Sequence, residues 1–163
     1  PAPSRLHQQI LGRLFRRLAD ITEREDCETY PAPFDVLLSE PGTEASGDNA
    51  DTITTVVQPD ISVFCRTDVL DDHGATAAPD IAIEILSPAT SHKDQTEKLA
   101  LYERHGVREY WLVNGESGFV MVYRLEQAGR FGKPDYYNGD DKVISHVLGG
   151  AEIALAQFLP GDR

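Results

Sequence analysis

Two acidic residues interrupt apolar, β-branched segments of the sequence. Asp60 follows Pro59 in "VVQPDISVF", and Glu84 lies inside "DIAIEIL". Burying a carboxylate without a partner is costly, so such residues indicate a site where a ligand or a cation compensates the charge. Carboxylate oxygens are the ligands that Mg²⁺ and Mn²⁺ prefer, and the chemistry that they support is metal-assisted hydrolysis. The alternatives are that Asp60 caps the entry to a strand and that backbone donors satisfy Glu84.

These two segments are expected to pair as antiparallel strands. The beginning of the first strand then lies beside the end of the second, which places Asp60 opposite Glu84 with Cβ atoms about 5 Å apart. Asp80 stands four residues before Glu84 and therefore roughly 13 Å away along the strand. We expect Asp80 at the other end of the sheet, near Cys65, in a structural role.

A cation that orients water or stabilises the transition state is also expected near the two acids. Lys98 is the candidate, because it lies on the predicted helix that follows the Glu84 strand. Asp94 precedes it by four residues and shares its helix face, so an ordinary surface pair is the alternative. A zinc site is not expected, since His73 and His92 lack ligand spacing and neither cysteine is near the acids in the sequence.

The hydrophobic pattern predicts a mixed α/β fold in which a central sheet is flanked by helices. Residues 80–86 form a strand buried on both faces, and a helix connects it to a parallel neighbour, 109–114. Residues 1–163 form one domain, with a loop at 40–52. The other predicted elements are a helix at 4–19 capped by Ser4, strands at 34–38, 52–65 (broken at Pro59), 119–127 and 141–148, a closing segment at 151–160, a hairpin turn at 115–118, and a helix capped by Thr90 or Ser91 and closed by Gly106.

The composition of the chain limits the binding partners and the cellular location that we expect. The chain has 163 residues and a net charge of −12, which repels phosphate backbones. Four basic residues gather in the first helix, and we expect a solvated helix face there rather than a nucleic-acid patch. They are Arg5, Arg13, Arg16 and Arg17. No transmembrane run or signal peptide is recognised, so a cytoplasmic location with free thiols at Cys27 and Cys65 is expected.

Several longer segments together carry a family resemblance. They are "YPAPFDVLLSE", "TVVQPDISVF", "APDIAIEILSPATSHKDQTEKLALYERHGVREYWLV" and "VYRL". The chain resembles the Uma-type family of restriction endonucleases, within the PD-(D/E)xK nuclease-like superfamily, over roughly residues 5–158. The long central segment is the specific part of this match.

The resemblance implies a restriction-endonuclease-like core and assigns roles to individual residues. Asp60 takes the place of the motif aspartate and Glu84 that of the second acid, with the backbone carbonyl of Ile85 as a further metal ligand. The superfamily normally has a lysine two residues after the second acid, where this chain has Leu86. The lysine function is therefore expected at Lys98.

On the first helix, Gln8 and Gln9 stand near the position where many relatives supply a glutamate.

The expected function is a Mg²⁺-dependent (or Mn²⁺-dependent) endonuclease that hydrolyses phosphodiester bonds in DNA, with a homodimer as one possible form and no membrane partner. The alternative is a non-catalytic module on the same fold that binds a partner or dimerises. A hydrolase of small phosphoesters is a third reading.

Overall fold

A six-stranded mixed sheet forms the centre of the molecule. The computed structural model describes residues 2–40, 54–88 and 92–161. The strand order is β1-β4-β7-β8-β9-β10, in which β7 and β8 are parallel and every other neighbouring pair is antiparallel. The strands are β1 (Glu28–Pro31), β4 (Ile61–Phe64), β7 (Ile81–Ile85), β8 (Glu109–Asn114), β9 (Phe119–Arg124) and β10 (Asp135–Asn138).

Strand β7 runs through the middle of this sheet, and all five of its residues are buried. Its near-continuous apolar sequence is typical of a strand covered on both faces. The helix α2 (His92–Arg104) connects it to β8, as the sequence predicts for a parallel pair. The turn at 115–118 then joins β8 to β9 as a hairpin, which is also confirmed.

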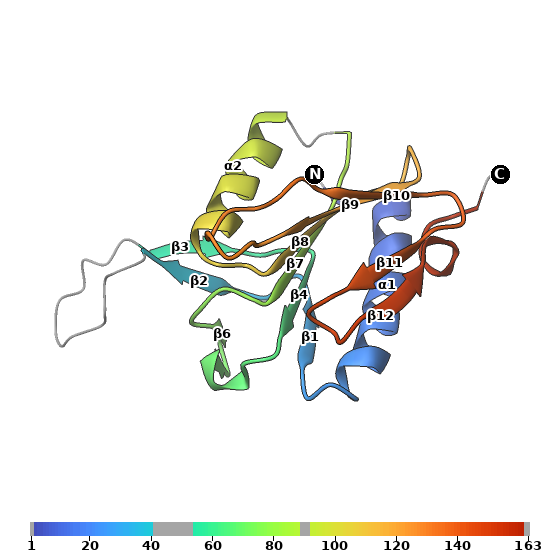
Figure 1. Ribbon diagram of the computed structural model, residues 1–163. Coiled ribbons are helices and arrows are strands. Elements are labelled where there is room, and N and C mark those ends of the chain that lie inside the picture. Colours follow the sequence, from blue (N-terminus) through green and yellow to red (C-terminus); the bar gives the residue numbers. More distant parts are fainter. Residues whose placement is uncertain (1, 41–53, 89–91, 162–163) are drawn as a thin grey trace, which may run out of the picture.

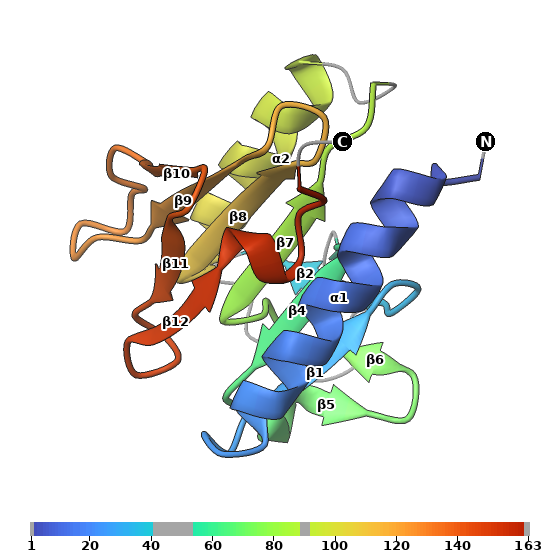
Figure 2. The same ribbon diagram turned by 90° about the vertical axis from the view of Figure 1, so that its right-hand side faces the viewer.

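Helix α1 (Arg5–Thr22) covers one face of the sheet, as Figures 1 and 2 show. It begins where predicted, because the Ser4 hydroxyl accepts a hydrogen bond from the His7 N–H at 3.1 Å. Its apolar positions Ile10, Leu14 and Leu18 are fully buried in the largest core cluster, against side chains of β4, β7 and β8. The spacing of three and four residues thus places α1 on the sheet.

Helix α2 covers the opposite face (Figure 1). Tyr102 of α2 packs with Ala82, Tyr110 and Leu112 in a second core cluster. The helix ends before Gly106, whose φ of +76° is the left-handed conformation that favours glycine. The predicted caps at 90 and 91 lie outside the described residues.

Two smaller sheets complete the fold. One has the order β3-β2-β6-β5 and lies on the α2 side of the central sheet, and the β11-β12 hairpin lies on the α1 side (Figure 1). Their strands are β2 (Val36–Ser39), β3 (Thr54–Val57), β5 (Leu70–Asp71), β6 (Gly74–Ala75), β11 (Lys142–Ser145) and β12 (Ala151–Ala154). The single strand predicted around Pro59 is therefore two strands in different sheets. A predicted loop, at 40–52, falls almost wholly outside the described residues.

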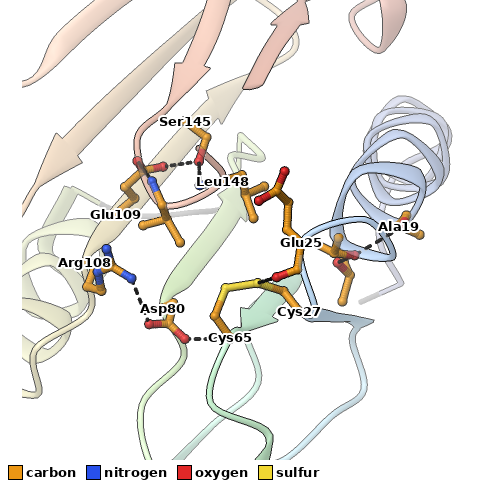
Figure 3. The surroundings of a disulfide bond; sticks show 12 residues. Ala19, Glu25, Cys27, Cys65, Asp80, Arg108, Glu109, Ser145 and Leu148 are labelled. Carbon is orange, nitrogen blue, oxygen red and sulfur yellow. Dashed lines mark hydrogen bonds and ion pairs between the residues drawn. A yellow bond between two sulfur atoms is a disulfide. The ribbon is translucent and has the colours of Figure 1, made fainter. Parts of the chain in front are cut away.

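The predicted free thiols are wrong, because Cys27 and Cys65 form a disulfide (Figure 3). Strand β1 pairs with β4 so that Glu28 stands opposite Phe64, and the next pair outward is Cys27 and Cys65. Their Cα atoms are 4.2 Å apart. Disulfides persist in oxidising compartments, so the bridge removes the support that free thiols gave to a cytoplasmic location. No helix in the described part of the chain is both long and apolar enough to cross a membrane.

Candidate active site

The strand register brings the two predicted acids to one edge of the central sheet. Ile61 pairs with Ile83 across β4 and β7, so the residue before β4, Asp60, stands opposite Glu84. The Asp60 carboxylate accepts a hydrogen bond from the Ile85 N–H at 2.7 Å. The antiparallel pairing expected from the sequence is therefore confirmed, and Asp60 lies directly beside the backbone of the residue that follows Glu84.

Helix α1 contributes a side chain that the sequence analysis missed. His7 Nε2 lies 3.1 Å from Asp60 Oδ1, and His7 is only 8% exposed. The other oxygen of Asp60 is the one bonded to Ile85, so both carboxylate oxygens are held. His7 precedes Ile10 and Leu14 on the buried face of α1. A titratable residue on an otherwise apolar stripe was the signal that could have revealed it.

Glu84 is held from the other face of the sheet. The Tyr102 hydroxyl donates to Glu84 Oε1 at 2.8 Å, and Lys98 Nζ lies 3.3 Å from Oε2. The pKa of Glu84 is raised to about 7, and burial is the largest cause. The charge of Asp60 also raises this pKa, whereas Lys98 and the Tyr102 hydrogen bond lower it. The carboxyl group is therefore poised between its neutral and charged forms near neutral pH.

Lys98 reaches the end of β7 from α2, as the sequence predicts. Its Nζ also lies 3.8 Å from Asp94 Oδ2, so it contacts two carboxylates. The lysine position of the superfamily motif is occupied by Leu86, which packs with the core on the α2 side. The amine at this site thus comes from the helix rather than from the strand.

The donor set suits a hard cation. Asp60 and Glu84 stand at opposite positions of the strand register, and Mg²⁺ commonly uses one or two carboxylates with waters completing its shell. Within the described ranges, no group of three or more His, Cys, Asp or Glu side chains is arranged to hold a metal ion. Both carboxylates are contacted by groups of the protein itself, Asp60 by His7 and Ile85 and Glu84 by Tyr102 and Lys98.

Asp80 lies at the opposite end of β7 from Glu84, as expected. Its carboxylate accepts from the Cys65 N–H at 2.7 Å and lies 3.5 Å from Arg108 Nη1 (Figure 3). These contacts bridge the ends of β4 and β8. Asp80 is therefore not brought to the candidate site.

A family described as "Uma2: Putative restriction endonuclease" matches residues 1–156. The chain belongs to the Uma2 family. The match includes every residue of the candidate site, from His7 on α1 to Lys98 and Tyr102 on α2.

A solved structure from Anabaena variabilis, described as a "putative nuclease belonging to DUF820", has a similar fold. The TM-score is 0.71 at 20% sequence identity, and the similarity covers 98% of this chain and 83% of that one. No curated protein matched the chain. For this Uma2 member, the structural likeness confirms the predicted α/β fold, in which helices flank a central mixed sheet.

Proposed function

We propose that this protein is a divalent-metal-dependent endonuclease that hydrolyses phosphodiester bonds in DNA. The observation that carries the proposal is that Asp60 stands opposite Glu84 in the strand register and close enough to raise its pKa, while Lys98 Nζ lies 3.3 Å from Glu84 Oε2. Membership of the Uma2 family supports the same reaction class. A buried carboxyl group with a raised pKa beside a second carboxylate and a lysine is typical of functional sites.

In this proposal Asp60, Glu84 and the Ile85 carbonyl would hold Mg²⁺ or Mn²⁺. A bound cation of this kind polarises a phosphoryl oxygen and lowers the pKa of a coordinated water. His7 fixes one oxygen of Asp60, and Tyr102 fixes one oxygen of Glu84. These two contacts preorganise the carboxylates before substrate arrives.

Lys98 is proposed as the electrostatic catalyst. During hydrolysis, a bond forms between the water oxygen and phosphorus while the bond to the leaving oxygen breaks, and negative charge accumulates on the phosphoryl group. A cation fixed nearby stabilises this charge more than it stabilises the ground state. Lys98 Nζ is already held at the end of β7 by Glu84, so little reorganisation is needed.

The test is relaxation and linearisation of supercoiled plasmid by wild type, Asp60→Asn, Glu84→Gln and Lys98→Met, with Mg²⁺ or with EDTA. Each substitution preserves side-chain shape, and circular dichroism checks the fold. The expected result is Mg²⁺-dependent cleavage by the wild type and a loss of at least about 100-fold in the carboxylate variants. Equal activity in all four proteins would mean that another nuclease in the sample causes the cleavage.

A non-catalytic module on the same fold is the second candidate. It is favoured by Leu86 at the usual lysine position. It is also favoured because groups of the protein itself already contact both carboxylates. On this alternative the pure wild type cleaves neither plasmid nor small phosphodiesters with either metal. A wild type that cleaves small phosphodiesters alone would favour the phosphoester hydrolase.

A further inference from the structure

The outward face of α1 carries a row of arginines in a chain whose net charge is −12. At 100° per residue, Arg5, Arg13 and Arg16 fall within about 80° of one another. Arg5 and Arg16 are exposed and Arg13 is half-buried, while Ile10 and Leu14 face the core. We call Arg5, Arg13 and Arg16 the α1 arginine row.

The α1 arginine row has no acidic partner in the described part of the chain. None of its three side chains forms an ion pair or hydrogen bond with the residues that the structure describes, whereas four of the other described arginines do pair with carboxylates. Those paired arginines are Arg104, Arg108, Arg124 and Arg130. The row therefore presents uncompensated positive charge, and it ends near Asp20, one turn beyond Arg16.

One end of the row lies at the same end of the central sheet as the candidate active site. Arg5 and Gln9 line a cavity of about 640 Å³ together with the turn at 115–118. That turn follows β8, whose Val113 pairs with Ile85. Two residues after Arg5, His7 contacts Asp60. The arginine row thus begins at the same sheet edge as the acids and extends away from it along α1.

We propose that the α1 arginine row is the surface that contacts the phosphate backbone of DNA and leads it to the site. The sequence alone favoured a solvated helix face, but two observations favour a bound ligand: the row lacks acidic partners among the described residues, and it begins at the same end of the sheet as the acids. Arginine suits phosphate because its guanidinium donates two parallel hydrogen bonds. The eleven residue steps from Arg5 to Arg16 span about 16 Å along the helix, close to five base-pair steps of duplex. This inference rests on the proposed function, since it names the docking surface of that reaction.

The chemistry of α1 argues against a membrane as the partner. Peripheral helices bind membranes by inserting an apolar face below their charged residues. Here that face is occupied, because Ile10, Leu14 and Leu18 are fully buried against the sheet. Only the charged face of α1 remains available to a partner, and a polyanion can bind to such a face through electrostatic attraction alone.

The experiment measures binding of a fluorescent duplex of about 20 base pairs by anisotropy, in EDTA so that no cleavage occurs. The proteins are wild type, the triple variant Arg5→Gln/Arg13→Gln/Arg16→Gln, and Arg66→Gln. Arg66 is an exposed arginine beyond the opposite end of β4 from Asp60, so it is the matched control. We expect the triple variant to bind at least about tenfold more weakly, with a salt slope lower by roughly 2 to 3, and Arg66→Gln to bind as wild type does.

Three results would overturn the inference: no DNA binding by the wild type, equal binding by the triple variant, or a loss as large in Arg66→Gln. Anionic phospholipid vesicles and duplex RNA serve as parallel arms, and a loss confined to either one would also overturn it. Thermal unfolding checks that the triple variant folds. If the row proves necessary for DNA binding but the wild type cuts no plasmid, the docking surface stands and the proposed catalysis fails.

Discussion

Glu84 is a buried carboxyl group whose surroundings both oppose and favour its charge. Burial and Asp60 favour the neutral form, whereas Lys98 and Tyr102 favour the charged form. Its pKa of about 7 lies above the ordinary value of 4.5, so the folded state binds a proton more tightly than the unfolded chain does. This group therefore stabilises the fold fully below pH 4.5, and that contribution is lost as pH rises through 7.

The prediction at this residue is a pH-dependent difference between wild type and Glu84→Gln. Between pH 5 and pH 8 the wild type should lose up to roughly 3 kcal/mol of unfolding free energy relative to the variant, because only the wild type must bury a charge at high pH. Urea unfolding at both pH values measures it. A difference that is constant between the two pH values would mean that Glu84 is charged throughout.

His7 is predicted to act by holding Asp60. Replacing it with leucine removes the contact to Asp60 Oδ1 and should lower Mn²⁺ affinity and nuclease rate by about 10- to 100-fold, as loss of a residue behind a metal ligand typically does. His7→Gln places an amide nitrogen near the position of Nε2 and should retain most of both. Metal titration and plasmid cleavage provide the two readouts. Equal losses in both variants, with an intact fold, would show that His7 only fills space.

At the scale of elements, the disulfide fastens the edge strand β1 to β4. The strand has four residues and contributes little apolar side-chain burial, so pairing alone holds it weakly. The other end of β1 reaches the site, where Ala32 N–H donates to the Asp60 carbonyl at 2.9 Å. The bridge thus secures the strand that supports the backbone of Asp60.

Reduction, or a Cys27→Ser/Cys65→Ser variant, is predicted to lower the unfolding free energy by roughly 3 to 4 kcal/mol. The cysteines are 38 residues apart, and opening a loop of this length restores entropy to the unfolded chain. Urea unfolding with and without reductant measures the change. The reduced wild type and the double variant should coincide, and a wild type unaffected by reductant would show that the thiols are free.

Glu109 of β8 fastens the turn between β11 and β12. Its carboxylate accepts hydrogen bonds from Trp111 Nε1, the Ser145 hydroxyl, and the His146 and Val147 N–H groups, and it is 1% exposed. The predicted effect of Glu109→Gln is a loss of about 2 to 3 kcal/mol in stability, because one amide NH₂ would face donors. Chemical unfolding measures it. DNA binding and cleavage by the folded fraction should be unchanged, which separates this carboxylate from Glu84.

At the scale of the whole molecule, the two ends of the central sheet have different roles. One end gathers His7, Asp60, Glu84 and Lys98, and the other gathers the disulfide and Asp80. Figure 2 shows the first residues of α1 and the end of β7 on the same side of the molecule. The disulfide and the contacts of Asp80 therefore fix the end of the sheet that lies away from the candidate site.

Much of this arrangement was predictable from patterns that act locally. The apolar run of β7 and the three-and-four spacing of α1 identify those elements, and the antiparallel pairing places Asp60 opposite Glu84. The disulfide was not predictable, because β1 is a short strand that ends in Pro31 and lacks a strand pattern. His7 was missed because its role depends on which face of α1 meets Asp60, a tertiary contact that helical periodicity alone does not specify.

The most direct test is diffraction from crystals soaked in Mn²⁺, with data collected for its anomalous signal. The account predicts a peak about 2.0–2.2 Å from carboxylate oxygens of both Asp60 and Glu84, absent in an Asp60→Asn/Glu84→Gln crystal. Peaks only on surface acids, with none between these two residues, would contradict it.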